Sequence, residues 1–85
     1  MIDSSRLEEE LRSETLKWLK RAQALYSTLS SGDERFLENI KAYISDSRHF
    51  LDKGDLIRAF EAVVWAWAWM EIGLEIGLIK DGKKD

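Results

Sequence analysis

The pattern of apolar and polar residues is clearest between residues 55 and 79, where apolar side chains recur with the period of an α-helix. Spacings of three and four positions place one set on a single helical face. This set is Leu56, Phe60, Val63, Trp67, Met70, Leu74 and Leu78. The apolar periodicity continues for far longer than the 3–10 residues of a usual strand. The pattern therefore predicts a helix over residues 55–79.

Two further sets of residues widen the apolar surface of this helix. Small residues that lie beside the first stripe predict a close-packing seam with a neighbouring helix: Ala59, Ala62, Ala66, Gly73 and Gly77. Further round the helix lie the residues of a possible interface: Trp65, Trp69, Ile72 and Ile76, with Arg58 at their margin. An ordinary surface helix needs an apolar stripe of only about 100°. We therefore expect this third helix to be the most buried, with its tryptophan-rich face incompletely covered.

Two earlier segments, residues 4–30 and 34–53, show the same helical period. Asp33 and Asp55 are good N-cap residues, and Gly54 suits the left-handed position that ends a helix. The connections are very short, which makes neighbouring helices antiparallel. The sequence predicts an all-α, antiparallel up-down-up three-helix bundle without β-strands, as a single domain over residues 1–85. Its expected common core is Leu11, Trp18, Leu25, Ile40, Ile44, Phe60, Val63, Trp67 and Met70.

Composition narrows the classes of function. The chain is 45% hydrophobic and 34% charged, with no proline and no cysteine, which is typical of a helical globular domain. Without cysteine, neither a disulfide framework nor a thiolate metal site can form. A net charge of −3 gives no basic footprint for nucleic acid. Glu71 and Glu75 interrupt the apolar segment and argue against a membrane span. We expect a cytoplasmic protein with no nucleic-acid or membrane partner.

Few residues offer candidate chemistry. His49 is the only histidine and falls opposite the core face of its helix, so it predicts neither a metal site nor a nucleophile–base pair. Glu61, Glu71 and Glu75 share the polar sector of the third helix, where a solvated face is the simpler interpretation than acid–base work or cation binding. Asn39 and Asp46 lie at the edge of the second helix's core face. They are either polar groups at a binding groove or residues that hydrogen-bond to a neighbouring helix. We assign no catalytic, cofactor-binding or metal-binding residue and expect no cofactor.

The segment from Tyr43 to Leu78 resembles an archaeal family known as domain of unknown function 357. The residues that carry the resemblance are Tyr43, Asp46, Phe50, Leu51, Lys53, Gly54, Asp55, Ala59, Phe60, Ala62, Trp65, Ala66, Trp69, Gly73 and Gly77. The chain departs from the family's pattern at Ala68, Met70 and Glu71, where the family often has Gly before its Trp and Leu-Asp after it. The resemblance implies a small left-handed three-helix bundle from an archaeon, and it implies no known activity.

Three classes of function remain for such a chain. The excess apolar surface of the third helix favours a non-catalytic protein-interaction or self-assembly module, with a protein partner that is most simply a second copy in a homodimer. The alternative is a small-molecule or nucleotide-binding module that uses the tryptophan-rich face, which requires convergent polar groups around Trp65 or Trp69. An enzyme such as a helical-bundle ribonuclease is disfavoured, because the arginine–histidine spacing of such enzymes is absent around His49.

Overall fold

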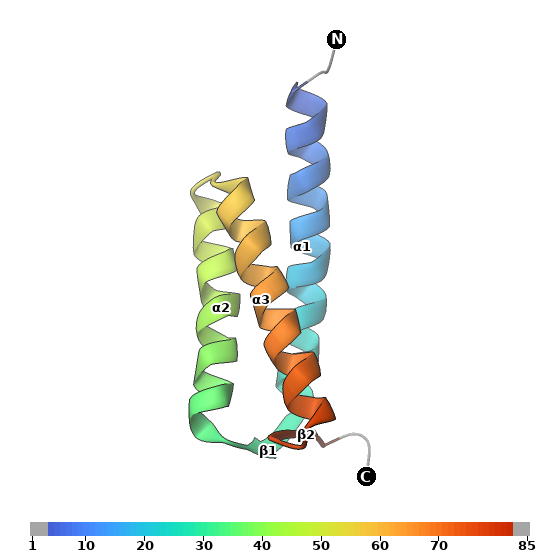
Figure 1. The fold of residues 1–85 in the computed structure, drawn as a ribbon. Coiled ribbons are helices and arrows are strands. Elements are labelled where there is room, and N and C mark those ends of the chain that lie inside the picture. The colour runs from blue at the N-terminus through green and yellow to red at the C-terminus, as the bar shows by residue number, and fades with distance from the viewer. Residues whose placement is uncertain (1–3, 83–85) are drawn as a thin grey trace.

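The computed structural model describes residues 4–82 and contains three helices and two short strands. The helices are α1 (Ser4–Thr28), α2 (Glu34–Asp52) and α3 (Leu56–Glu75), and the strands are β1 (Leu29–Gly32) and β2 (Ile79–Asp81). Figure 1 shows that neighbouring helices along the chain run in opposite directions. The prediction of an all-α three-helix fold is therefore confirmed, whereas the expectation that no strand would form is wrong.

The starts of α2 and α3 form as their capping residues predict. The Asp33 carboxylate accepts the backbone N–H of Phe36 at 3.0 Å, and the Asp55 carboxylate accepts that of Arg58 at 3.3 Å. Each satisfies one amide that the first helical turn leaves unpaired. Gly54 has a φ of 80° and lies in open space, so it ends α2 in the left-handed conformation.

The third helix ends at Glu75, four residues before the predicted boundary. Gly77 has a φ of 79°, and the Leu78 N–H donates to the Gly73 carbonyl at 2.9 Å. The Gly77 N–H donates to the Leu74 carbonyl at 3.4 Å, which completes the paired bonds of a Schellman ending. Nothing lies within 4 Å of a Cβ placed on Gly77. Its assignment to the close-packing seam is therefore wrong, because it is a helix terminator.

The two strands close one end of the bundle as a small antiparallel sheet in which Gly32 pairs with Ile79. The Ile79 side chain is 1% exposed and belongs to the core. A Cβ on Gly32 would lie 2.6 Å from Ile79 Cγ2, so this close pairing requires glycine. The predicted end of the first helix at residue 30 is wrong, since the chain is already extended from Leu29 and the Thr28 carbonyl accepts the Gly82 N–H at 2.8 Å.

The core is centred on the small residues of α3 rather than on its large ones. The buried apolar side chains come from all three helices and from β2: Leu19, Ala22, Ile40, Ile44, Leu51, Leu56, Ala59, Ala62, Val63, Ala66, Met70 and Ile79. Phe60 and Trp67, which were predicted to be central, are only half-buried. The small side chains let the helices approach closely, and large rings fit only at the margins of such a contact.

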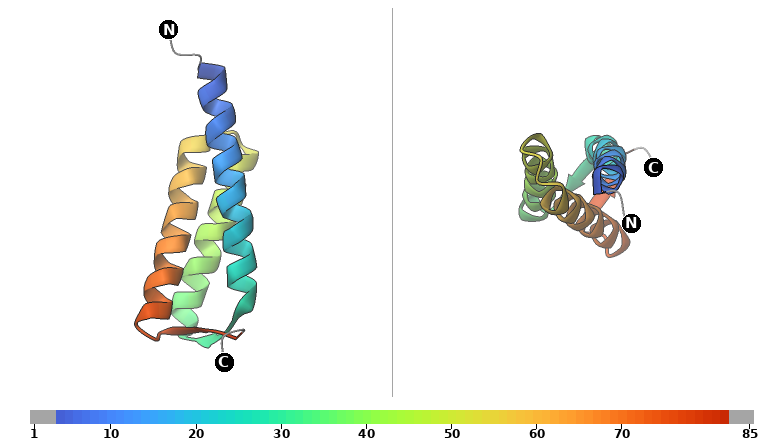
Figure 2. Two further views of the ribbon diagram at one scale, coloured as in Figure 1. Left: turned by 90° about the vertical axis from the view of Figure 1, so that its right-hand side faces the viewer. Right: turned by 90° about the horizontal axis from the view of Figure 1, so that it is seen from above.

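The first helix also buries a face that differs from the predicted core. Thr15, Leu19 and Ala22 are completely buried, whereas Trp18 is 36% exposed and was wrongly predicted to lie in the core. Leu11 and Leu25 are half-buried and pack against the core. The described part of the molecule extends over 50 × 21 × 18 Å, and Figures 1 and 2 show the first turns of α1 projecting beyond the turn between α2 and α3.

The two buried polar side chains are hydrogen-bonded, and one of them joins two helices. The Ser47 hydroxyl donates to the Ala59 carbonyl at 2.7 Å and so joins the middle of α2 to the beginning of α3. Thr15 is also buried, and its hydroxyl donates to the Leu11 carbonyl at 2.7 Å. Among the described residues no buried side-chain N or O atom lacks a hydrogen-bond partner.

Replacing Val63 by Asp should unfold the domain. Val63 is completely buried, and an unpaired buried charge costs several kcal/mol against a total stability of about 5–15 kcal/mol. The adjacent Val64 is 47% exposed, so Val64→Asp is a matched control that should remain folded. Far-UV circular dichroism with thermal melting measures both. A cooperative melt of Val63→Asp within a few degrees of wild type would contradict this placement of the core.

Gly73 and Gly77 should respond differently to substitution, although both were assigned to one seam. A Cβ on Gly73 would lie 2.6 Å from Phe36 Cε2, so Gly73→Ala overpacks the core and should cost about 1–3 kcal/mol. Gly77→Ala should cost about 1–2 kcal/mol because of its left-handed backbone. Asparagine tolerates that conformation, so Gly77→Asn should be milder than Gly77→Ala, whereas Gly73→Asn should be worse than Gly73→Ala. Urea unfolding distinguishes these orders, and the reverse order at either site would refute the assignment.

Candidate interaction surface on the third helix

The surface of α3 that faces away from α1 and α2 carries large apolar side chains along its whole length. We define the outer face of α3 as Ile57, Val64, Trp65, Ala68, Ile72 and Ile76. Its five large side chains are between 47% and 69% exposed. They follow helical spacing on the side opposite the buried Ala59, Ala62, Ala66 and Gly73. Glu61 and Glu75 are exposed between them. A largely apolar strip on a helix that is already packed on its other side is typical of an interaction surface.

The aromatic residues of α2 fix the tryptophans at one edge of the outer face. The Tyr43 ring stacks on Trp65 with centroids 6.2 Å apart and an interplanar angle of 19°. Trp69 is half-buried, with its centroid 4.6 Å from that of Phe36 and 6.2 Å from that of Tyr43. Aromatic pairs at these separations contribute an attraction in addition to that from burying apolar area. Trp69 therefore belongs to the α2–α3 contact, and Trp65 is presented outward from it.

A shallow hollow of about 230 Å³ lies on this edge of the outer face. It is lined only by apolar side chains, namely Phe36, Trp65, Ala68, Trp69 and Ile72. The small Ala68 side chain leaves room between the larger side chains around it. Ligand sites for small polar molecules contain a few convergent polar groups, and this hollow has none. Its chemistry suits another apolar side chain.

A second groove, of about 340 Å³, lies between α1 and α3 on the other edge of the outer face and is lined in part by Trp18, Phe60, Trp67 and Glu71. The Trp18 and Trp67 rings meet edge to face with centroids 5.7 Å apart. The Trp67 indole N–H donates to the Trp18 carbonyl at 3.1 Å. These contacts hold the two rings against each other at the α1–α3 contact.

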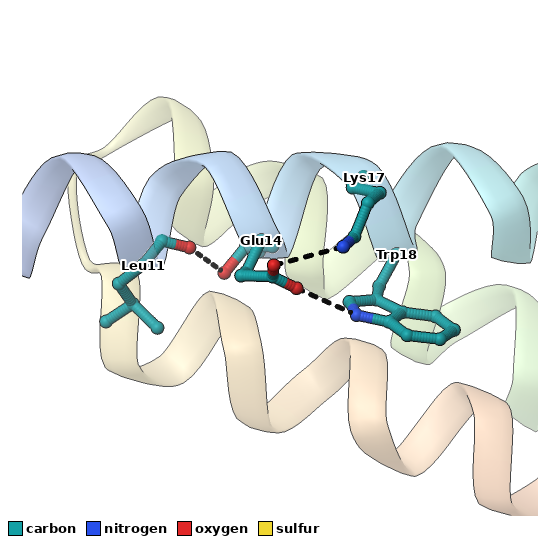
Figure 3. A network of polar contacts seen from close by, with 5 residues as sticks. Leu11, Glu14, Lys17 and Trp18 are labelled. Atoms are coloured by element: carbon teal, nitrogen blue, oxygen red, sulfur yellow. Dashed lines mark hydrogen bonds and ion pairs between the residues drawn. The ribbon is translucent and has the colours of Figure 1, made fainter.

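Trp18 is held from the solvent side by charged neighbours on α1, shown in Figure 3. Its indole N–H donates to Glu14 Oε2 at 3.1 Å, and Lys17 Nζ donates to Glu14 Oε1 at 3.0 Å. The hydrogen bond from Lys17 is the largest cause of the lowered pKa of Glu14. The Arg21 guanidinium lies 5.0 Å from the Trp18 ring centroid, within the range of a cation–π interaction. Glu14 is exposed, so this network orients Trp18 without forming a buried charged site.

The structure separates the residues of the possible interface. Trp65, Ile72 and Ile76 are exposed on the outer face, whereas Trp69 is half-buried against α2. The Arg58 guanidinium lies 3.6 Å from the Asp55 carboxylate and 5.9 Å from the Phe50 ring centroid. Arg58 therefore flanks the apolar strip near the start of α3.

The remaining polar candidates do not converge on a site. His49, Asn39 and Asp46 are exposed on α2, and Glu61 and Glu75 are exposed on α3. Within residues 4–82, no group of three or more His, Cys, Asp or Glu side chains could hold a metal ion. None of the described helices is long and apolar enough to cross a membrane.

Sequence reasoning missed Ile57, Val64 and Ala68 as residues of the outer face. They share one helical face, at spacings of seven and four, directly opposite the small-residue seam. Had the seam been taken as the centre of the buried face, the same 100° rotation per residue would have placed all three outward. The missed signal is therefore in the sequence, in the position of the alanines.

The chain belongs to the family described as "Protein of unknown function (DUF357)", which it matches over residues 7–79. The predicted resemblance is therefore confirmed, and it extends into the first helix. The fold is similar to the crystal structure of a DUF357 protein from the archaeon Archaeoglobus fulgidus, with 65% sequence identity and a TM-score of 0.85. That match covers 88% of this chain and 97% of the other. A comparison with curated proteins found no match.

Replacing Trp67 by Phe should weaken the α1–α3 contact without unfolding the bundle. The change removes the hydrogen bond to the Trp18 carbonyl, which is worth about 0.5–1.5 kcal/mol, and half-burial of the ring limits the loss of packing. Trp65→Phe is the matched control, because the Trp65 side chain is more than half exposed. Urea unfolding at a low protein concentration, where the chain is monomeric, should show a lower stability only for Trp67→Phe. Equal stabilities of the two variants would mean that the Trp67 contact contributes nothing.

Proposed function

We propose that this protein is a non-catalytic protein-interaction module that self-associates through the outer face of α3. The observation that carries the proposal is the row of five large, half-exposed apolar side chains along that face. The largest apolar patch on an ordinary monomer is about 300–600 Å² and is often functional. A strip that runs the length of a 20-residue helix is about 30 Å long, which is the length of a full helix–helix contact.

A second copy is the partner that we propose. Most soluble oligomers are homo-oligomers, and a twofold dimer joins one patch to the same patch of its copy. Aromatic residues are enriched at the centres of interfaces and charged residues are depleted there. Trp65 and Ala68 are near the middle of the outer face, whereas Arg58 and Glu75 are near its ends. Arg58 and Glu75 therefore suit the rim of an interface, whereas the exposed Glu61 interrupts its apolar centre.

The alternative of a small-molecule or nucleotide site is less well supported. The hollow beside Trp65 has only apolar walls, and the groove beside Trp67 has one charged lining residue, Glu71. A carboxylate does not favour a phosphate. The expectation of a cytoplasmic protein without a cofactor remains part of the proposal.

Replacing Trp65 by Glu should yield a folded monomer. A charge at the centre of the interface must lose its water on association, and removal of a central aromatic residue commonly costs at least 2 kcal/mol. We therefore expect the dimer dissociation constant to rise by at least about 30-fold. Sedimentation equilibrium over a range of concentrations measures the constant, and far-UV circular dichroism measures folding. Trp65 is a better test than Trp69, whose contact with Phe36 would also be lost.

Ala42→Glu is the matched control, because Ala42 is exposed on α2 and the variant adds the same charge away from α3. It should associate as strongly as wild type. A wild-type protein that stays monomeric at all concentrations would refute self-association, as would Trp65→Glu with an unchanged dissociation constant.

A further inference from the structure

We infer that the groove between α1 and α3 binds a small organic cation whose ammonium nitrogen carries methyl groups in place of hydrogens. The observation that carries this inference is a cluster of three aromatic rings beside one carboxylate, from Trp18, Phe60, Trp67 and Glu71. Every lining residue belongs to one chain, so the inference goes beyond self-association and does not depend on it. The site also differs from the hollow beside Trp65, which has no charged wall.

The aromatic rings of the groove come together through helical spacing and through the α1–α3 contact. Phe60 and Trp67 are seven positions apart on α3, which places them on one side of the helix, two turns from each other. Trp18 joins them from α1, with its ring plane at 88° to that of Trp67 and the two centroids 5.7 Å apart. Perpendicular rings form a corner in which a ligand contacts both. The groove, of about 340 Å³, has room for a trimethylammonium group, which is smaller than a tryptophan side chain.

The charge of the groove favours a cation. Glu71 follows Trp67 by four positions, so it lies one turn further along the same side of α3, and it is exposed. It takes part in none of the ion pairs within residues 4–82. An aromatic ring is negative on its face and attracts a cation within about 6 Å of its centroid, most strongly when the ring is tryptophan. The carboxylate and the rings therefore select the same ligand charge.

The apolar walls determine which kind of cation fits. A metal ion requires several oxygen ligands, and Glu71 is the one carboxylate that lines the groove. A primary ammonium is strongly hydrated and has three N–H donors, and donors that are buried without a partner cost free energy. A trimethylammonium group has no N–H donor, and its methyl groups bury apolar area against Val63 and Ala68. Aromatic clusters recognise cations of this kind in other proteins.

Cations of the chain itself lie over one of the three rings. The Arg21 guanidinium is 5.0 Å and Lys17 Nζ is 5.8 Å from the Trp18 centroid, and Lys17 is neutralised by its ion pair with a carboxylate of the same helix. Within residues 4–82, no cation lies over Phe60 or Trp67. A ligand therefore finds these two rings unoccupied, whereas the charge of Arg21 opposes its binding.

Titration with choline chloride tests the site when it is followed by proton–nitrogen correlation NMR at a constant protein concentration. The four tryptophans each give one indole N–H signal, which is assigned by replacing each tryptophan in turn with phenylalanine. The signals of Trp18 and Trp67 should move together, and those of Trp65 and Trp69 should stay in place. We expect a dissociation constant on the order of 1 mM, because choline has few atoms with which to make contacts.

The matched ligand control is the neutral alcohol in which carbon replaces the charged nitrogen of choline without changing its shape. It should bind at least about fivefold more weakly, since it lacks the cation–π attraction. Glu71→Gln should weaken choline binding about two- to fivefold and leave binding of the alcohol unchanged. Arg21→Gln should tighten choline binding about twofold. Glu38→Gln, at an exposed position on α2 outside the groove, should change neither, and far-UV circular dichroism checks that each variant is folded.

Equal affinities for choline and the neutral alcohol would overturn the inference, as would an unchanged affinity of Glu71→Gln for choline. A shift of the Trp65 signal alone would also overturn it, since that signal reports a change in association and not occupation of the groove. A trimethyllysine peptide and phosphatidylcholine vesicles carry the same group on larger partners. Binding of either at least about tenfold more tightly than choline would overturn the assignment to a free small cation. Sedimentation measures self-association separately, so failure of this inference is distinguishable from failure of the proposed function.

Discussion

The close approach of the helices at the small residues of α3 determines much of the rest of the structure. Ala59, Ala62, Ala66 and Gly73 form the buried side of this helix, and none of them has a side chain large enough to hold its neighbours apart. The tryptophans of the same helix cannot enter such a narrow space. They are displaced to its margins, where they pack against rings of α1 and α2, or to its exterior. Tight packing on one side of α3 thus leaves its tryptophans at the margins of the core or outside it.

This constraint explains which parts of the fold follow from the sequence. The three helices, the caps at Asp33 and Asp55 and the turn at Gly54 depend on local chemistry, and local chemistry can be inferred from neighbouring residues. The face that each helix buries was harder to predict. Size and hydrophobicity favoured Trp18, Phe60 and Trp67 as core residues, but the depth of burial is set by how closely two backbones approach. That distance depends on residues of two helices together.

The sheet could not be anticipated from periodicity. Leu29–Gly32 and Ile79–Asp81 are too short to show alternation, and each has its partner at the far end of the chain. The only local signal was Gly77, which is compatible with both a packing seam and a helix end. The exposed edge of the candidate surface was predicted through Trp65, Ile72 and Ile76, whereas Ile57, Val64 and Ala68 required the correct phase.

The pairing of β2 with β1 has a consequence for how the chain reaches its native state. The short turn at Gly54 joins α2 to α3, so this helical hairpin closes with little loss of chain entropy. The strands instead join Gly32 to Ile79 and close a loop that contains the entire hairpin. This non-local step becomes favourable only after the hairpin has brought the two segments together. We therefore expect β2 to pair late in folding, when Ile79 completes a core that the helices have already assembled.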